Sequence, residues 1–168
     1  HGSERLQVSP DILAGDSPLH DSFRLRKMLD RHLELVALKH DLPLKDTRLL
    51  LYLTQMGPST SRKDLADFTN QSRSSVTLSL QWLSSRELIK LDDPRREESR
   101  KEAARKDEPE KKRLLITFLP AAEPILEDLD GALGDIRQEL LTGFTEEEAE
   151  ACFQFNSRIQ DNIRKALS

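Results

Sequence analysis

Between Arg62 and Gln81 the sequence concentrates side chains that can donate hydrogen bonds to another molecule. An arginine can donate two hydrogen bonds to the edge of a guanine, and a glutamine can pair with an adenine. Arg73 and Gln81 offer these groups, and the methyl group of Thr77 can meet the methyl group of a thymine. The other donors of this cluster, suited to phosphates or bases, are Ser72, Ser74, Ser75, Arg62 and Lys63. Their types predict contact with DNA if a helix presents them outward.

The remaining reactive residues form no catalytic or metal-binding pattern. The sequence has no GxSxG string, no phosphate-binding loop and no glycine-rich dinucleotide turn. His32 and His40 lie about two helical turns apart, which is too far to share one ion easily. One cysteine excludes an internal disulfide framework, and we predict that Cys152 is buried and structural. We therefore expect no enzymatic activity, no cofactor and no metal.

Hydrophobic periodicity predicts the elements that position the donor cluster. The predicted helices cover Asp21 to His40, Lys45 to Met56, a short segment capped by Ser61, Arg73 to Arg86, Ala121 to Leu141, and a last segment after the capping box of Thr145 and Glu148. The stretches Leu88 to Leu91 and Arg113 to Leu119 are predicted strands. Helix, turn, helix and hairpin in this order are typical of a winged helix-turn-helix.

The helix from Arg73 to Arg86 has one apolar stripe. Val76, Leu80 and Leu83 recur at steps of four and three, so this face is predicted to lie inward. The outer half then carries Ser74, Thr77, Leu78, Gln81 and Trp82. Leu78 and Trp82 can pack against the hairpin base or the helical frame, or contact thymine methyl groups; packing is the favoured interpretation for Trp82.

The predicted fold class is mainly α with a small β-hairpin. A winged helix-turn-helix lobe, residues 45–119, is inserted in an α-helical dimerisation body made of residues 18–44 and 120–168. A lone chain would leave Phe153, Ile159 and Ile163 uncovered, and dimerisation would bury them. Residues 1–17 are predicted to be a flexible N-terminal arm, and His1-Gly2-Ser3 is typical of a cloning remnant.

The charge of the chain is unevenly distributed. Its 168 residues include 26 basic and 30 acidic ones, for a net charge of −4. The segment from Ser59 to Leu119 nevertheless holds 14 basic and 11 acidic residues. On charge alone, this segment fits a polyanionic partner and a solvated charged loop equally well. The longest apolar runs are too short to span a bilayer, and no leader segment is evident. We expect a cytoplasmic protein without membrane contact.

The predicted wing, Asp92 to Lys112, holds eight basic and eight acidic residues and almost no apolar ones. We expect Arg95, Arg96 and Arg100 to order on DNA, straddling the backbone or entering the minor groove. The alternative is a solvated loop that touches nothing.

Four local strings carry a resemblance to a known family. They are Lys63-Asp64-Leu65-Ala66, Ser72-Arg73-Ser74-Ser75-Val76-Thr77, the pair Leu83 and Leu88-Ile89, and Ile116-Thr117-Phe118-Leu119-Pro120-Ala121-Ala122. In this order, within a frame of long helices, they resemble the MarR family of bacterial regulators, over roughly Ser22 to Leu167. The resemblance implies a homodimer that binds palindromic double-stranded DNA. It also implies a small-molecule effector, for which His32, Arg48 and Tyr52 are the candidate ligand-binding residues.

Four departures from the family pattern qualify the resemblance. One is that Glu123 or Ala122, depending on the alignment, stands where the family's strand-to-helix string ends in glycine. Leu78 stands where a basic residue is common, Glu87 replaces the glycine that usually ends the helix, and the wing around Asp93-Pro94-Arg95-Arg96 is much longer. We predict a transcriptional regulator, a repressor released by a small molecule. The alternative is a winged-helix interaction adaptor that has lost sequence-specific DNA binding.

Overall fold

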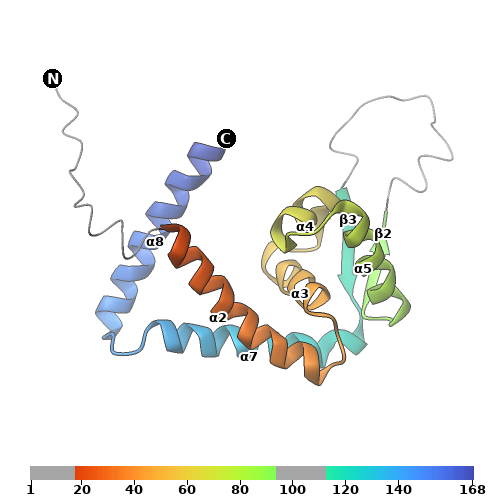
Figure 1. The fold of residues 1–168 in the computed structure, drawn as a ribbon, viewed down its shortest axis with the longest axis horizontal. Helices are drawn as coiled ribbons and strands as arrows, with labels where there is room; N and C mark the ends of the chain where they lie inside the picture. Colours follow the sequence, from red (N-terminus) through yellow and green to blue (C-terminus); the bar gives the residue numbers. More distant parts are fainter. Residues whose placement is uncertain (1–17, 94–112) are drawn as a thin grey trace. The chain divides into compact units, whose positions relative to one another are not determined.

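The computed structural model describes residues 18–93 and 113–168. The predicted arm and the wing arginines Arg95, Arg96 and Arg100 lie outside the described residues. The elements, shown in Figure 1, are α2 (Pro18–Lys39), α3 (Leu44–Met56), β1 (Ser59–Ser61), α4 (Arg62–Thr69), α5 (Arg73–Ser85), β2 (Ile89–Asp92), β3 (Arg113–Phe118), η2 (Pro120–Ala122), α7 (Glu123–Leu140) and α8 (Glu146–Leu167). The chain divides into two compact units, one ending at Ala132 and the other spanning Leu133–Ser168.

Helix α3 lies at the centre of the first unit. Its run from Leu49 to Leu53 is buried on every side, because α2, α4 and α5 all pack against it. Pro43 precedes the helix and Gly57, at a φ of 84°, ends it; a proline before and a glycine after a helix are the usual boundary signals. Met56, the last residue of the helix, is 60% exposed.

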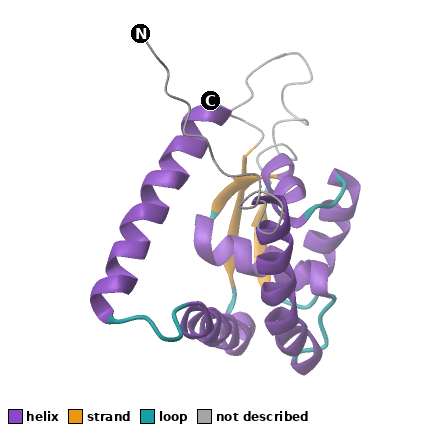
Figure 2. Cartoon of the chain, turned by 60° about the vertical axis from the view of Figure 1, so that its left-hand side comes forward, coloured by secondary structure: helices purple, strands orange, loops and turns teal. Residues whose placement is uncertain are grey.

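A small antiparallel sheet adjoins these helices (Figure 2). The strand order is β1-β3-β2, so β3 is the central strand and pairs on both edges. Leu114 and Ile116 of β3 are buried while their neighbours face outward, as the period of two requires. The sequence predicted only a two-stranded hairpin; the third strand, β1, is three polar residues of which Thr60 alone is buried.

Helix α8 belongs to the second unit and has the predicted capping box. Thr145 accepts from the backbone N–H of Glu148, and Glu148 accepts from the backbone N–H of Thr145, at 3.1 and 2.9 Å. The hydrogen bond from the backbone N–H of Thr145, and after it one from the Thr145 side chain, lower the pKa of the Glu148 carboxyl. No side chain of α8 is buried, and Cys152 is exposed, so the prediction of a buried cysteine is wrong for the single chain.

Helix α7 runs without interruption through Gly131 and Gly134. A Cβ atom at either glycine would meet no atom within 4 Å, so in the described part of the chain no other element approaches α7 closely at these two positions. None of the helices within residues 18–93 and 113–168 is both long and apolar enough to cross a membrane.

The end of α2 is held to α7 by one carboxylate. Asp128 Oδ2 lies 2.9 Å from Lys39 Nζ and 2.6 Å from His40 Nε2. Hydrogen bonds from Lys39 and His40, in that order, lower the pKa of the Asp128 carboxyl. This contact fixes the turn that follows α2, where Asp41 has a φ of 53°.

Asp46, in the first turn of α3, is a buried carboxyl with an incomplete set of partners. It is 2% exposed, and its Oδ1 atom has no hydrogen-bond partner among the described residues. Burial raises the pKa of Asp46, against smaller lowering effects of the Ser79 hydroxyl and the Lys45 ammonium. Because the pKa of this carboxyl rises on folding, Asp46 stabilises the fold at pH values below 3.8, the ordinary pKa of an aspartate. That contribution is lost as the pH rises through the raised pKa of the folded protein.

We predict that Asp46→Asn stabilises the protein at neutral pH, because no charge then has to be buried. The free energy of unfolding at pH 7 is expected to rise by on the order of 1 kcal/mol. The gain should shrink as the pH falls toward 3.8, where wild-type Asp46 is also neutral. Urea denaturation at a series of pH values measures both effects.

The matched control is Asp130→Asn, which neutralises an exposed carboxyl of α7 and should leave the pH profile of stability unchanged. A less stable Asp46→Asn variant at pH 7 would show that the buried charge is favourable and would contradict the prediction.

Candidate nucleic-acid interface

Helices α4 and α5 are each started by a serine cap. The Ser61 hydroxyl accepts from the backbone N–H of Asp64, and the Ser72 hydroxyl accepts from that of Ser75, both at 3.1 Å. Asn70, at a φ of 54°, turns the chain between the helices. An asparagine tolerates this left-handed conformation better than most residues, so the sequence specifies a tight helix-turn-helix.

The face of α5 that points inward is the predicted one. Val76, Leu80 and Leu83 are each 0% exposed, packed where α5 meets α3, α4 and β2. The opposite face carries Ser74 and Gln81, which are exposed, and Leu78, which is 62% exposed. The prediction of the inner and outer faces of α5 is confirmed.

Among the predicted DNA contacts, Arg73 and Lys63 are the cations most available to a ligand. Both are exposed, and neither side chain has a hydrogen bond or an ion pair within the described part of the chain. Gln81 is equally exposed. The hydroxyl groups of Ser72 and Ser74 lie 3.1 Å apart at the tip of α5 and remain exposed.

Arg62 is held inside the lobe. Its Nε donates to Thr77 Oγ1 at 3.2 Å, and its Nη2 lies 3.1 Å from Asp93 Oδ2. The side chains of Arg62 and Asp93 are only 22% and 10% exposed. Arg62 therefore ties α4 and α5 to the root of the wing, and part of its charge is compensated before any ligand arrives.

Two predicted hydroxyl contacts are also engaged internally. Thr77 donates its hydroxyl hydrogen to the Arg73 carbonyl while accepting from Arg62, which leaves its methyl group as the free part. Ser75 donates to Gln71 Oε1 at 2.7 Å.

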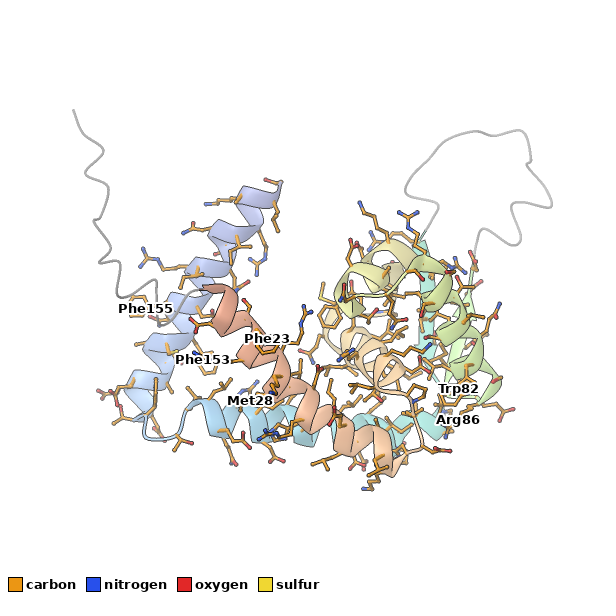
Figure 3. The ribbon with its side chains drawn as sticks, in the orientation of Figure 1. Phe23, Met28, Trp82, Arg86, Phe153 and Phe155 are labelled. Atoms are coloured by element: carbon orange, nitrogen blue, oxygen red, sulfur yellow. The ribbon has the colours of Figure 1, made fainter. Side chains whose placement is uncertain are left out.

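The far end of α5 is fastened by Arg86, a residue that the sequence did not single out. Arg86 donates to the carbonyl groups of Asp41 and His40 at 2.9 and 3.2 Å. Its guanidinium lies 4.8 Å from the ring centre of Trp82, one helical turn earlier, and Figure 3 shows the two side chains next to each other. Trp82 is thus partly covered by an arginine at the end of its own helix, whereas the packing interpretation named the hairpin base or the helical frame. The spacing of four residues between Trp82 and Arg86 could have predicted this contact from the sequence.

Glu87 ends the helix in the position of the expected glycine. It adopts a φ of 59°, while the backbone N–H groups of Glu87 and Leu88 donate to the carbonyls of Ser84 and Leu83. A left-handed conformation costs a residue with a side chain about 1–2 kcal/mol, which these hydrogen bonds and the contacts of Arg86 offset.

A groove of about 740 Å³ separates α5 from the strand β2 that leads to the wing. Arg62, Thr77 and Gln81 line one wall, and Lys90 and Asp92 belong to the other. The walls carry charges of both signs, so the groove alone favours neither an anion nor a cation.

The candidate effector residues are only partly brought together. An open cavity of about 630 Å³ lies among α2, α3 and α4, and Arg48 lines it while donating to both carboxylate oxygens of Asp30, at 2.9 and 2.7 Å. Tyr52 is buried against Phe68, with ring centres 4.6 Å apart, and only Phe68 reaches the cavity. His32 does not line it. No cluster of three or more potential metal ligands occurs in the described ranges 18–93 and 113–168.

Comparison with known proteins shows a likeness at the level of the fold. No protein-family model matches the chain, and no curated protein matches it by sequence. A solved MarR-family regulator from Silicibacter pomeroyi has a TM-score of 0.66 at 15% identity, over 94% of this chain and 97% of its own. A second MarR-family regulator from that organism has a TM-score of 0.63 at 17% identity, over 92% and 93%. The transcriptional regulator PA3341 has a TM-score of 0.59 at 22% identity, over 93% and 98%. The chain therefore has the winged-helix fold found in MarR-family regulators, and the predicted fold class is confirmed.

Proposed function

We propose that this chain, with its MarR-type winged-helix fold, is a DNA-binding transcriptional regulator that acts as a homodimer on a palindromic operator. It is a cytoplasmic repressor that a small-molecule effector releases from DNA, and it has neither enzymatic activity nor a cofactor. The solved structures of the same fold are transcriptional regulators, which supports the assignment.

The observation that carries the proposal is the outward surface of α5. The helix contains no aspartate or glutamate, in a chain with 30 acidic residues, and it exposes Arg73, Ser74 and Gln81. In a helix-turn-helix the N-terminal part of the second helix contacts base edges in the major groove. Arg73 suits guanine and Gln81 suits adenine, while Lys63, Arg62 and the serine cluster contact phosphates.

The wing contributes a second contact. Arg95, Arg96 and Arg100 come two, three and seven residues after Asp93, whose carboxylate is bound to Arg62 at the start of α4. The wing therefore leaves the lobe at its DNA-facing end. We assign these three arginines to the DNA backbone or the minor groove.

Dimerisation is supported by the composition of α8. No side chain of the helix is buried in the described part of the chain, and Phe153, Ile159 and Ile163 are between 44% and 54% exposed. A continuous apolar stripe of this kind is covered in soluble proteins by another molecule or element. A second copy covering it would carry a second α5, and a two-fold pair of α5 helices selects a palindromic site.

The effector is assigned to the cavity among α2, α3 and α4. The charge of Arg48 is shared with Asp30, and Asp67 also lines the cavity, so Arg26 is the cation there that no described residue pairs. Leu29, Leu51 and Phe68 supply apolar surface, and together with Arg26 they suit a small aromatic anion. Such a ligand releases DNA only if it binds one spacing of the two lobes better than the other. Of the three candidates, Arg48 retains a direct role; Tyr52 acts through Phe68, and His32 is assigned none in this cavity.

The interaction adaptor remains the second candidate, and two observations favour it. Leu78 places an exposed apolar group where a phosphate contact is common, and Arg62 shares its charge with Asp93. An adaptor would bind DNA only at low salt and without sequence preference.

We predict that Arg73→Ala weakens binding to the operator by about 1–3 kcal/mol, roughly 5- to 150-fold, and relaxes base preference. The measurement is fluorescence anisotropy at several salt concentrations, with duplexes tiled across the region upstream of the protein's own gene. Lys63→Ala, which loses a phosphate contact, should weaken binding to all duplexes alike and reduce the salt slope by about 1.

Arg31→Ala, at an exposed arginine of α2, is the control that should leave affinity and slope unchanged. Salt-sensitive binding of equal strength to every duplex, unaffected by Arg73→Ala, would reject the regulator and favour the adaptor.

We predict that Ile159→Asp converts the dimer into a monomer, because it places a charge in the apolar stripe of α8. Sedimentation equilibrium measures the mass directly. Gln154→Asp, at an exposed position on the side of the same helix away from Ile159 and Ile163, is the control and should remain dimeric. A wild-type chain that sediments as a monomer at micromolar concentration contradicts the homodimer.

We predict that filling the cavity with Leu29→Trp abolishes effector release without weakening DNA binding in the absence of effector. A panel of small aromatic carboxylates, benzoate first, is titrated into the protein–DNA complex and scored by anisotropy. Release that persists unchanged in Leu29→Trp would place the effector elsewhere, and a panel without any effect would reject the anion site.

A further inference from the structure

Leu78 is an exposed apolar residue at the centre of a polar surface. It is 62% exposed, and no residue in the described part of the chain covers it. Helical spacing places it between Ser74, four residues before, and Gln81, three residues after, on the face opposite the buried stripe of α5. A leucine that is mostly exposed adds little to the stability of the lobe, so its side chain is available to contact a ligand.

Trp82, in contrast to Leu78, is an apolar side chain of α5 that is partly covered. It lies one turn further along α5, where Arg86 stacks on its ring and also binds the turn after α2. The packing that accounts for Trp82 does not extend to Leu78. Leu78 therefore remains the apolar group of the outer face.

The charges around Leu78 favour a polyanion over a protein partner. No acidic residue occurs anywhere on α5, and the exposed Arg73 and Lys63 lie at the N-terminal ends of α5 and α4. Hydrogen-bonding groups flank the leucine on both sides along the helix. This is the composition of a surface that meets base edges, where polar groups meet nitrogen and oxygen atoms and apolar groups meet the methyl group of thymine.

We propose that Leu78 is a specificity-determining residue that contacts the 5-methyl group of one thymine in each half of the operator. The inference rests on the proposed DNA-binding function and adds to it the identity of one base. Leu78 follows Arg73 by five residues, a rise of about 7.5 Å along the helix. The thymine is therefore a different base from the one contacted by Arg73.

The test removes the methyl group and nothing else. A binding site is first selected from a randomised duplex library at physiological salt with the full-length protein. Each thymine of the selected site is then replaced by deoxyuridine, one position per half-site at a time, and the dissociation constant is measured by anisotropy. One thymine per half-site is expected to show a loss of about fourfold, the value of one buried methyl group near 0.8 kcal/mol.

The same duplexes are then measured with two variants. Leu78→Ala is expected to bind the thymine and deoxyuridine duplexes equally, with an affinity close to that of wild type on deoxyuridine. Leu78→Met keeps an apolar side chain of similar size and is expected to keep the discrimination. Because Leu78 is exposed, circular dichroism and thermal unfolding should be the same for all three proteins.

The results separate failure of the inference from failure of the function. A selected site in which no deoxyuridine matters, or in which the penalty persists in Leu78→Ala, overturns the role of Leu78 while leaving the regulator intact. If no sequence is selected from the library and binding to all duplexes is equally salt-sensitive, the role of Leu78 and the regulator function are both overturned. Leu78 would then belong to a surface that binds another protein.

Discussion

The single apolar stripe of α5 determines which side chains this protein offers to a ligand. Val76, Leu80 and Leu83 are fully buried, and each contributes about 1.5–3 kcal/mol relative to exposure. Rotating the helix by one residue would bring part of this stripe into water and would bury polar groups instead. The Ser72 cap fixes the start of the helix, and Arg86 fixes its end. The polar outer face is therefore a consequence of core packing and needs no separate stabilisation.

The sequence predicted the helices and the faces of α5 because long periodic patterns and capping residues are local signals. It missed β1, where only Thr60 of three polar residues is buried, since three residues carry no period. It misplaced Cys152 because periodicity identifies the apolar side of a helix but not what covers that side. It grouped His32 with Tyr52 as cavity residues, although membership of a cavity wall depends on how neighbouring helices are rotated against one another.

The lobe has more basic than acidic residues, but fewer of its cations are available to a ligand than this count suggests. Arg62 shares its charge with Asp93, and Arg113 donates to the hydroxyl of Ser59. Arg86 donates to two backbone carbonyls. These arginines hold elements of the lobe together. Arg73 and the neighbouring Lys63 are left to act outward, so a charge count along the sequence cannot separate structural cations from ligand-binding ones.

Strand β3 is the middle strand of its sheet, so both of its edges are already hydrogen-bonded to neighbouring strands. Ser61 pairs with Arg113 on one edge, and Asp92 pairs with Leu115 on the other. The two points where the wing leaves and rejoins the lobe are thus set by the sheet. Doubling the number of residues between such fixed points costs only about 0.6 kcal/mol of closure entropy. This part of the chain can therefore gain or lose residues during evolution while the helices behind it keep their register.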